Sequence, residues 1–448
     1  MSPERLAEPP DRSGAASAGA AAIRAVEIAG RAGFYGLLAG LRWLRAGGRR
    51  PTAIAGETLT DCCESLGATF IKMGQILSAR SDLFPNELIR PLRRLQDDVA
   101  ALQAKRLDRV VEQVFDRPPD EIFEQLDPEP LASASIAQVH RGVLRQSVDG
   151  IREVAVKLRR PGVARQIRTD LRLLAFGARL LESLPPLRNL PLRAAVAEVA
   201  AALEQQLDFV QEGDNNARFR QNLSAAERVR LPRVVARWSN RQVLVMELIR
   251  PLERLDQSSL DRAQLELGTL TGLRSLFRMI FMDGFIHADL HPGNVFFQDD
   301  GSVVMLDTGL VARLGGDDLL DFKSFFFGMV ANDGRRCARV IERTAVDRGA
   351  GFESRAFREQ MVALIAHHSR LVTEDFDVAV FVAALFDLQR RHQLRGSTAF
   401  TMAILSLAVY EGIVKQTHPT LDFQRQALAF FVKHRLNLDP ALDRSSGR

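Results

Sequence analysis

Three polar side chains in the second half of the chain could carry out phosphoryl chemistry together. Asp289 and Asn294 belong to the segment Gly284–Asn294, and Asp307 follows a later apolar run. A carboxylate such as Asp289 can orient an attacking hydroxyl group or water, whereas an amide and a second carboxylate can hold Mg²⁺ against nucleotide phosphates. We therefore predict that Asp289 is catalytic and that Asn294 and Asp307 bind Mg²⁺ and a nucleotide.

The segments around these residues predict the elements that position them. His287–Asn294 has the H-x-D-x-x-x-x-N spacing of the protein-kinase catalytic loop, with Ala288 where protein kinases have arginine. We predict a helix that ends at Asp283–Gly284 before the loop and a hairpin turned by Asp299–Gly301 after it. A turn without a catalytic role is the alternative for a cluster of Pro, Gly and Asn residues. The order of helix, loop, hairpin and D-x-G is typical of a kinase C-lobe and favours the catalytic interpretation.

A lysine that could contact nucleotide phosphates precedes the catalytic loop. Lys157 ends the run Val154–Lys157, which matches the strand signature V-A-I-K of protein kinases with one conservative change. An edge strand that ends in a solvated lysine is the simpler alternative. The order of the motifs favours the phosphate role, and we also expect Ala155 to contact the nucleotide.

The segment before this strand is rich in alanine where protein kinases have a glycine-rich loop. We predict that seven of its residues line the nucleotide: Ala132, Ser133, Ala134, Ser135, Ile136, Ala137 and Val139. Each Cβ restricts the backbone, so this loop should be stiffer than a glycine loop. A small-residue turn between two strands is the alternative without a function.

An upstream block, Leu66–Pro85, contains Lys72, Gly74 and Gln75 in the order K-x-G-Q. A glycine within a helical pattern costs about 1 kcal/mol relative to alanine, so Gly74 should have a reason such as close helix packing. Together with the alanine-rich loop, the strand lysine and the catalytic loop, this block resembles the UbiB (ABC1, AarF) family of atypical kinase-like proteins over residues 57–345.

The resemblance implies a two-lobed, protein-kinase-like α+β fold with a K-x-G-Q helical extension before it and a helical extension after it. It implies binding of ATP or ADP with Mg²⁺, an atypical kinase or ATPase activity, and regulatory K-x-G-Q helices across the substrate entrance. It further implies support of ubiquinone or related prenyl-lipid biosynthesis at a membrane, with a quinone precursor and a homodimer or biosynthetic complex as partners. The alternative is a nucleotide-binding regulatory or lipid-chaperoning module with negligible turnover.

The resemblance also implies an acidic helix that supplies a partner for the strand lysine. In Glu204–Asn216 the family's E-x-D segment becomes Gln206-x-Asp208, so the first acid is missing. We predict that Glu212 pairs with Lys157, with Asp208 one turn earlier on the same helix face. A solvated acidic face is the alternative. Gln206 and the alanine-rich loop both favour the low-turnover alternative.

An apolar strand, Val243–Leu248, is predicted to connect the lobes beside the adenine base, with backbone hydrogen bonds to the base between Glu247 and Ile249. A buried strand is the alternative. The domains predicted on this basis are a basic N-terminal segment (1–56), the K-x-G-Q extension (57–117), the N-lobe (118–250), the C-lobe (251–345) and a C-terminal helical extension (346–448).

The amino-acid composition limits the cellular compartments and the kinds of partner that we expect for this chain. The 448 residues are 46% hydrophobic, which suits a folded protein of two lobes. The three cysteines form no disulfide framework and indicate a reducing, cytoplasmic compartment. His287 and His291 are expected to shape the catalytic loop and not to bind zinc. Most of the net charge of +5 lies in residues 1–50, which contain eight arginines and four acids. We expect no nucleic-acid partner.

The N-terminal segment begins with Pro- and Ala-rich sequence and continues with a helical apolar stripe among arginines. The stripe consists of Phe34, Leu37, Leu38, Leu41 and Leu44. Such a helix binds an anionic membrane surface or packs against the kinase body, and the sequence leaves both open. The start lacks a signal-peptide layout, and the longest apolar candidate, Ala399–Val409, is too short to span a membrane. We therefore expect a peripheral membrane protein.

Overall fold

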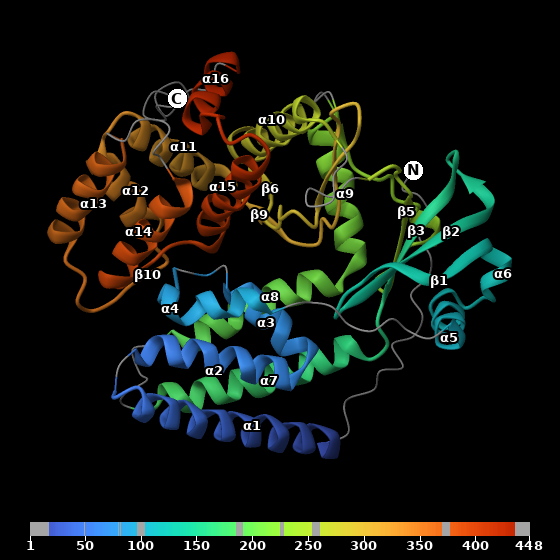
Figure 1. Ribbon diagram of the computed structural model, residues 1–448, viewed down its shortest axis with the longest axis horizontal. Coiled ribbons are helices and arrows are strands. Elements are labelled where there is room, and N and C mark those ends of the chain that lie inside the picture. The colour runs from blue at the N-terminus through green and yellow to red at the C-terminus, as the bar shows by residue number, and fades with distance from the viewer. Residues whose placement is uncertain are drawn as a thin grey trace. The chain divides into compact units, whose positions relative to one another are not determined.

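The computed structural model describes residues 18–48, 50–78, 80, 82–95, 104–184, 191–224, 228–252, 260–369 and 377–434. The Pro- and Ala-rich start of the predicted N-terminal segment lies outside these residues. The chain divides into two compact units (Figure 1). The first unit comprises Met1–Ala217 and Pro232–Ile249, and the second comprises Arg218–Leu231 and Arg250–Arg448.

Most of the helices in the first unit belong to the K-x-G-Q region and its neighbours. They are α1 (Ala18–Arg45), α2 (Pro51–Leu66), α3 (Ala68–Ser78), α4 (Asn86–Ile89), a 3-10 helix (Arg90–Arg94), α5 (Ala104–Phe115), α6 (Pro119–Ile122), α7 (Val163–Glu182), α8 (Leu192–Leu207) and α9 (Phe209–Asn222), which the two units share. Helices α2, α3, α7 and α8 enclose one apolar core, which contains Phe70, Met73, Leu92, Ile167 and Leu203.

A four-stranded antiparallel sheet forms the rest of the first unit. Its strands are β1 (Phe123–Ser133), β2 (Ala137–Val148), β3 (Ile151–Arg159) and β5 (Val243–Glu247), in the spatial order β1-β2-β3-β5. Val154 and Val156 of β3 are fully buried in a core that also contains Val111 of α5. This packing fixes the register of β3 and therefore the place of Lys157 on it.

The second unit contains small sheets and a helical bundle. Its strands are β4 (Val229–Arg230), β6 (Phe285–His287), β7 (Val295–Phe297), β8 (Val303–Met305), β9 (Val311–Arg313), β10 (Asp347–Arg348) and β11 (Leu394–Arg395). Its helices are α10 (Arg262–Arg278), α11 (Gly316–Val330), α12 (Gly334–Thr344), α13 (Ser354–Ser369), α14 (Val378–Arg391), α15 (Thr398–Thr417) and α16 (Phe423–Lys433). The strands pair as β4-β8-β7, β6-β9 and β10-β11.

The helix and the hairpin predicted around the catalytic loop are confirmed. Helix α10 starts at a capping box of Asp261 and Gln264 and continues into a π-helical turn, Met279–Asp283. Gly284 ends it with φ 56°, and a Cβ at that position would lie 2.1 Å from the Leu314 carbonyl oxygen. Only glycine fits there, so the chain must turn into the loop at this point. Strands β7 and β8 form the predicted antiparallel hairpin.

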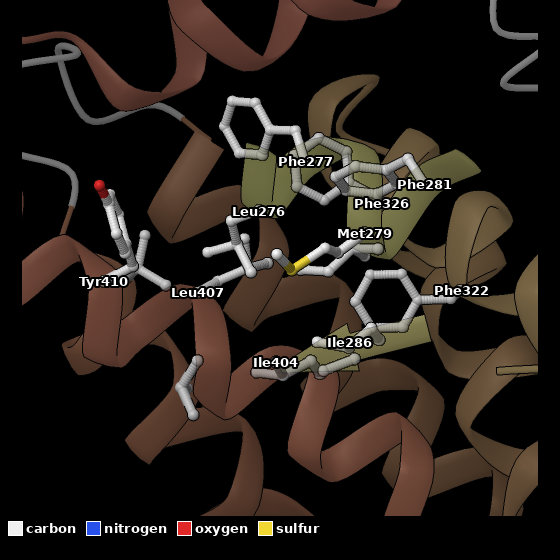
Figure 2. Packing of buried hydrophobic residues seen from close by; sticks show 14 of the residues in the cluster. Leu276, Phe277, Met279, Phe281, Ile286, Phe322, Phe326, Ile404, Leu407 and Tyr410 are labelled. Atoms are coloured by element: carbon white, nitrogen blue, oxygen red, sulfur yellow. The ribbon is translucent and has the colours of Figure 1, made fainter. Parts of the chain in front are cut away.

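The C-terminal helices pack on α10 through aromatic side chains, as Figure 2 shows. The labelled cluster contains Leu276, Phe277, Met279, Phe281, Ile286, Phe322, Phe326, Ile404, Leu407 and Tyr410. The predicted C-terminal helical extension is present, with Met361 and Ile365 fully buried on α13. This core supports β6, from which the catalytic loop begins.

Helix α15 is longer than its apolar centre suggested. Within the described residues it is the one helix long and apolar enough to cross a membrane, and 56% of its apolar window is buried inside the protein. It packs against α10, α14, β6 and β9. The prediction that Ala399–Val409 marks a short apolar segment therefore underestimated the helix, which spans Thr398–Thr417.

All three cysteines are buried and free. Cys62 and Cys63 lie on α2, and Cys337 lies on α12. Burial raises the pKa of the Cys62 thiol and raises the pKa values of Cys63 and Cys337 to about 12. The thiols are therefore protonated at neutral pH and behave as small core residues.

Candidate active site

The strand lysine lies against the acidic residue predicted as its partner. Lys157 pairs across the sheet with Val139 of β2 and Leu244 of β5. Its Nζ donates to Oε1 and Oε2 of Glu212 at 2.7 and 2.9 Å. The two side chains are only 12% and 3% exposed, and Nζ also lies 5.2 Å from the centre of the Phe209 ring. The first unit therefore holds a buried ion pair, and the phosphate-binding role of Lys157 stays a prediction.

Asp208 does not share a helix face with Glu212, and that prediction is wrong. Helix α8 ends at Leu207 and α9 begins at Phe209, with Asp208 at the junction. Its Oδ1 accepts hydrogen bonds from the backbone N–H groups of Val210 and Gln211, and its Oδ2 lies 3.5 Å from Nε of Arg241. An aspartate at this position satisfies amides that a new helix leaves free. Asp208 thus starts the helix that carries Glu212.

The residues predicted to line the nucleotide form the end of the β1–β2 hairpin. Ala132 and Ser133 belong to β1, Ala137 and Val139 belong to β2, and the turn runs through Ala134–Ile136. The turn closes with a hydrogen bond from the Ala134 N–H to the Ala137 carbonyl oxygen at 2.9 Å. Ala155 lies on β3, whose neighbour in the sheet is β2. The structure therefore brings these residues together in one sheet.

Arg160, which the sequence did not single out, holds this turn in place. Its backbone N–H donates to the Ile136 carbonyl at 2.8 Å, its Nε donates to the Ala134 carbonyl at 2.7 Å, and its Nη2 donates to Ser133 Oγ at 2.7 Å. These three bonds reach three different residues of the turn. The turn is therefore restrained by Arg160 in addition to the limits that the alanine side chains set on its backbone angles. The position of Arg160 directly after β3 was the available signal.

Ile136 anchors the same turn in the helical core of the first unit. Its side chain is buried in the cluster formed by α2, α3, α7 and α8. That cluster includes Phe70 and Met73 of the K-x-G-Q helix. Movement of the turn would therefore expose apolar surface that the K-x-G-Q helices now cover.

The K-x-G-Q residues lie on α3. A Cβ at Gly74 would lie 2.3 Å from Leu95 Cδ1, so the close packing expected at this glycine is present. Gln75 Nε2 donates to the Leu95 carbonyl oxygen at 3.2 Å. Lys72 is half-buried on the same helix. Gly74 and Gln75 thus bind the segment after the 3-10 helix to α3, and the regulatory role of all three residues stays a prediction.

In the second unit, the catalytic loop is held by bonds between Asp289 and Asn294. Asn294 Nδ2 donates to the Asp289 carbonyl oxygen at 2.9 Å and lies 3.4 Å from Asp289 Oδ2. The amide group therefore directs its nitrogen at Asp289 and presents Oδ1 on its other side. His291 closes the loop, because its Nδ1 accepts from the Gly293 N–H at 2.9 Å.

His287 connects the catalytic loop to the strand before Asp307. It is fully buried, its Nδ1 accepts from the Asp289 N–H at 3.2 Å, and its Nε2 lies 3.1 Å from the Leu306 carbonyl oxygen. Nε2 therefore carries the proton and donates to Leu306. Burial lowers the pKa of His287, which keeps the ring neutral at physiological pH. The expectation that His287 shapes the loop is confirmed.

The D-x-G carboxylate lies at the end of the same hairpin as Asn294. The Leu306 N–H donates to the Asn294 carbonyl oxygen at 2.9 Å, which extends the pairing of β7 and β8 towards Asp307. Asp307 has φ 52° in the left-handed region, and its Oδ1 accepts from the Gly309 N–H at 3.3 Å. Unusual backbone angles of this kind often occur at functional sites. The side chain is exposed.

The donors at this hairpin end suit Mg²⁺. An amide oxygen and a carboxylate are hard oxygen ligands, and Mg²⁺ commonly completes its coordination with phosphate oxygens and water. Among the residues that the structure describes, no group of three or more His, Cys, Asp or Glu side chains could hold a metal ion. Asn294 and Asp307 stay the predicted magnesium ligands on the chemistry of their oxygen atoms.

The predicted hinge strand has fewer free backbone groups than expected. The Glu247 N–H donates to the Arg233 carbonyl at 2.8 Å, and the Leu248 N–H donates to the Glu153 carbonyl at 3.1 Å. The Glu247 carboxylate accepts from Arg233 Nε at 3.0 Å. Both amides are therefore occupied within the first unit. These bonds use N–H groups only, and both Glu247 and Ile249 stay predictions for the adenine contact.

One solved structure of similar fold is the complex of Rv3197 with erythromycin from Mycobacterium tuberculosis. The similarity covers 77% of this chain and 87% of that chain, with a TM-score of 0.51 and 21% sequence identity. At this identity the comparison establishes the fold alone. The α+β kinase-like architecture with helical extensions is therefore confirmed.

Curated relatives match the chain over most of its length. Proteins named "Probable protein kinase UbiB" are 29% identical over 391 residues in Marinobacter nauticus, 31% identical over 399 residues in Aliivibrio fischeri and 30% identical over 405 residues in Vibrio cholerae. These alignments cover 85%, 87% and 89% of this chain and 70%, 72% and 73% of the respective relatives. The family model described as "ABC1 atypical kinase-like domain" matches residues 94–341. The chain therefore belongs to the ABC1 family of atypical kinase-like proteins, together with these UbiB relatives.

Proposed function

We propose that this chain is a UbiB-like atypical kinase or ATPase that uses Mg-ATP and supports ubiquinone or related prenyl-lipid biosynthesis at a membrane surface. The main support is the buried pair of Lys157 and Glu212, whose atoms lie 2.7 Å apart. A buried ion pair is a poor way to stabilise a fold, because desolvation offsets most of the attraction. A lysine held rigidly on a central strand is, by contrast, what nucleotide phosphates require.

Each residue of the candidate site has a role in this proposal. Lys157 contacts the α- and β-phosphates, with Glu212 fixing its Nζ. Asn294 and Asp307 hold Mg²⁺, which when bound neutralises charge on the phosphates. Asp289 orients the attacking oxygen and accepts its proton. His287 is a positioning residue, since it bonds the backbone on both sides of the site.

A nucleotide-binding regulatory module with negligible turnover is the second candidate. Gln206 in place of an acid supports it, and so does the turn held by Arg160 and Ile136, which resists the closure that commits a substrate to reaction. Steady-state Mg-ATP turnover separates the two candidates. The test compares the full chain with and without anionic vesicles and a phenol-like quinone precursor. Saturable nucleotide binding without turnover under all these conditions would favour the regulatory module.

The Asp307→Asn variant tests the nucleotide site. We expect it to weaken Mg-dependent ADP binding by about tenfold or more, because a metal ligand loses its charge. Asp299→Asn is the matched control, since Asp299 is an exposed aspartate at the turn of the same hairpin. The measurement is a thermal-shift titration with Mg-ADP. Equal affinity in Asp307→Asn and the unmodified chain would rule out the proposed site.

A further inference from the structure

Except for its last residue, Arg45, helix α1 bonds its charged side chains to the protein or to each other. Arg24 donates through Nε and Nη2 to the carboxylate of Asp170 at 2.8 and 3.0 Å, and Asp170 of α7 is fully buried. Arg31 donates to the Ser65 carbonyl, and Arg42 bonds Asp61 of α2 at 3.1 Å. The one acid of the helix, Glu27, accepts from Arg24 at 2.8 Å. The polar face of α1 is therefore used to attach it to α2 and α7.

The opposite face of α1 is apolar and exposed. Its large side chains are between 43% and 74% exposed: Ile23, Val26, Phe34, Leu37, Leu41, Trp43 and Leu44. Between them lie Gly30, Gly33, Gly36 and Gly40, where an added Cβ would meet no described atom within 4 Å. From Gly19 to Leu44 the exposed positions carry no charged residue. The helix is thus inverted relative to an ordinary surface helix, whose charged face meets water.

Helix α7, which packs beside α1, also exposes apolar side chains. It lies beside α1 (Figure 1), and the Arg24–Asp170 pair joins the two helices. Phe176, Leu180, Leu181 and Leu184, at and just beyond its C-terminal half, are between 43% and 68% exposed. The exposed charged residues nearest to them on the helix are Arg172 and Arg179. Of the twenty large apolar side chains exposed in the described chain, eleven belong to α1 and to this part of α7.

We propose that α1 and the C-terminal half of α7 form the surface by which the chain lies flat on an anionic lipid bilayer. The inference rests on the proposed membrane function and names the part of the molecule that performs it. The charge at the edge of the surface decides between lipid and a second copy of the chain. Arg45, Arg172 and Arg179 are exposed there, and a symmetric dimer would place two copies of this basic edge in one interface with no added acid. An anionic membrane surface instead attracts them.

The geometry also determines how binding responds to salt. Arg24, Arg31 and Arg42 already donate to acceptors within the protein, so their contribution to head-group binding should be smaller than that of arginines without such bonds. Burial of the apolar side chains in the acyl boundary supplies most of the binding, and the few free arginines add an electrostatic part. We therefore expect binding to persist at high salt, where charge interactions are screened.

The first test is a vesicle-flotation assay that compares the unmodified full chain with the full chain carrying both Leu37→Glu and Leu41→Glu. Two carboxylates on the exposed face should lower the ratio of bound to free protein by about tenfold or more on neutral and anionic vesicles. Val432→Glu is the matched control, because Val432 is 79% exposed on α16 in the second unit. Arg172→Gln with Arg179→Gln should reduce binding to anionic vesicles only, and only at low salt.

Several outcomes would overturn the proposal. The proposal is wrong if the variant with Leu37→Glu and Leu41→Glu floats with vesicles as well as the unmodified chain does. Conversion of an oligomer to a monomer by that variant, with flotation unchanged, would identify the face as a protein interface. Mg-ADP binding measured on the same samples tests the proposed function separately from the membrane surface. If the unmodified chain binds no Mg-ADP, the proposed function is refuted, whereas the flotation result still stands.

Trp43 offers a second measurement that does not depend on folding of the charged variant. The chain has two tryptophans, and Trp238 packs against the core of the first unit. In a Trp238→Phe variant, lipids with brominated acyl chains should quench the emission of Trp43. Quenching no stronger than that by brominated lipids added as free monomers would contradict insertion of α1.

Discussion

At the scale of single residues, the hydrogen bonds of the proposed active site show which groups could still bind a ligand. Asn294 directs its amide nitrogen at Asp289, and this leaves an oxygen for a metal. His287 uses both ring nitrogens on the backbone, so it holds the loop and does not take part in proton transfer. Arg160 uses three donors on one turn. The site is therefore held in place mainly by contacts to main-chain atoms.

A double-mutant cycle tests the Lys157–Glu212 pair. Lys157→Met and Glu212→Gln should each destabilise the fold by about 3 kcal/mol, because each removes one charge of a buried ion pair and leaves the opposite charge in the protein interior. The double variant should cost clearly less than the sum of the two, with an interaction energy of about 1 to 3 kcal/mol. Urea unfolding supplies the four free energies. Additive effects would mean that the two groups do not interact in solution.

At the scale of elements, helices α10 and α15 approach each other at a glycine. A Cβ on Gly272 would lie 1.9 Å from Tyr410 Oη, and that hydroxyl donates to the Thr269 carbonyl at 3.1 Å. Thr269 and Thr417 bond side chain to side chain at 2.6 Å beside this contact. Since Tyr410 is fully buried, the hydroxyl has no room to move away without loss of its bond.

Gly272→Ala should therefore destabilise the second unit by about 1 to 3 kcal/mol through overpacking. Gly412→Ala on α15 is the matched control, because a Cβ there meets no described atom within 4 Å. The control should stabilise the helix by about 0.5 to 1 kcal/mol. Thermal and urea unfolding of both variants give the comparison. A stable Gly272→Ala variant would show that α10 and α15 are farther apart than described.

Some elements were predictable from the sequence and others were not, for physical reasons. The end of α10 and the β7–β8 hairpin follow from local signals, because Gly284 and the Asp299–Gly301 turn permit few backbone conformations. Asp208 was misplaced because helix periodicity continues through a cap that only tertiary structure defines. The orientation of α1 was left open, since its partner Asp170 lies far away in the sequence.

At the scale of the whole molecule, each unit contains a histidine that must stay neutral. In the first unit, His140 Nδ1 donates to the Asp127 carbonyl at 2.8 Å and Nε2 accepts from Gln138 at 2.6 Å. In the second, His287 has one donating and one accepting nitrogen. Burial lowers the pKa of both rings, and this effect is larger than the opposing effects of the backbone hydrogen bonds and nearby carboxylates. Protonation would set a donor against a donor in each unit.

Stability should therefore fall with acidification. The pKa of each histidine is lower in the folded state than in the unfolded state, so the unfolded chain binds more protons as the pH falls below about 6.5. Each histidine should then reduce the free energy of unfolding by about 1.4 kcal/mol per pH unit. Urea unfolding at about pH 7.5, 6.5 and 5.5 measures the trend. A constant free energy of unfolding across this range would contradict it.

The buried cysteines make the unmodified chain a convenient background for site-specific labelling. Because Cys62, Cys63 and Cys337 are inaccessible and their thiols stay protonated, a maleimide reagent at neutral pH should ignore them. A single new cysteine at an exposed position would then carry the only dye or spin label, with no native residue replaced. Distances between labels on the two units could accordingly be recorded from doubly labelled protein whose core is untouched.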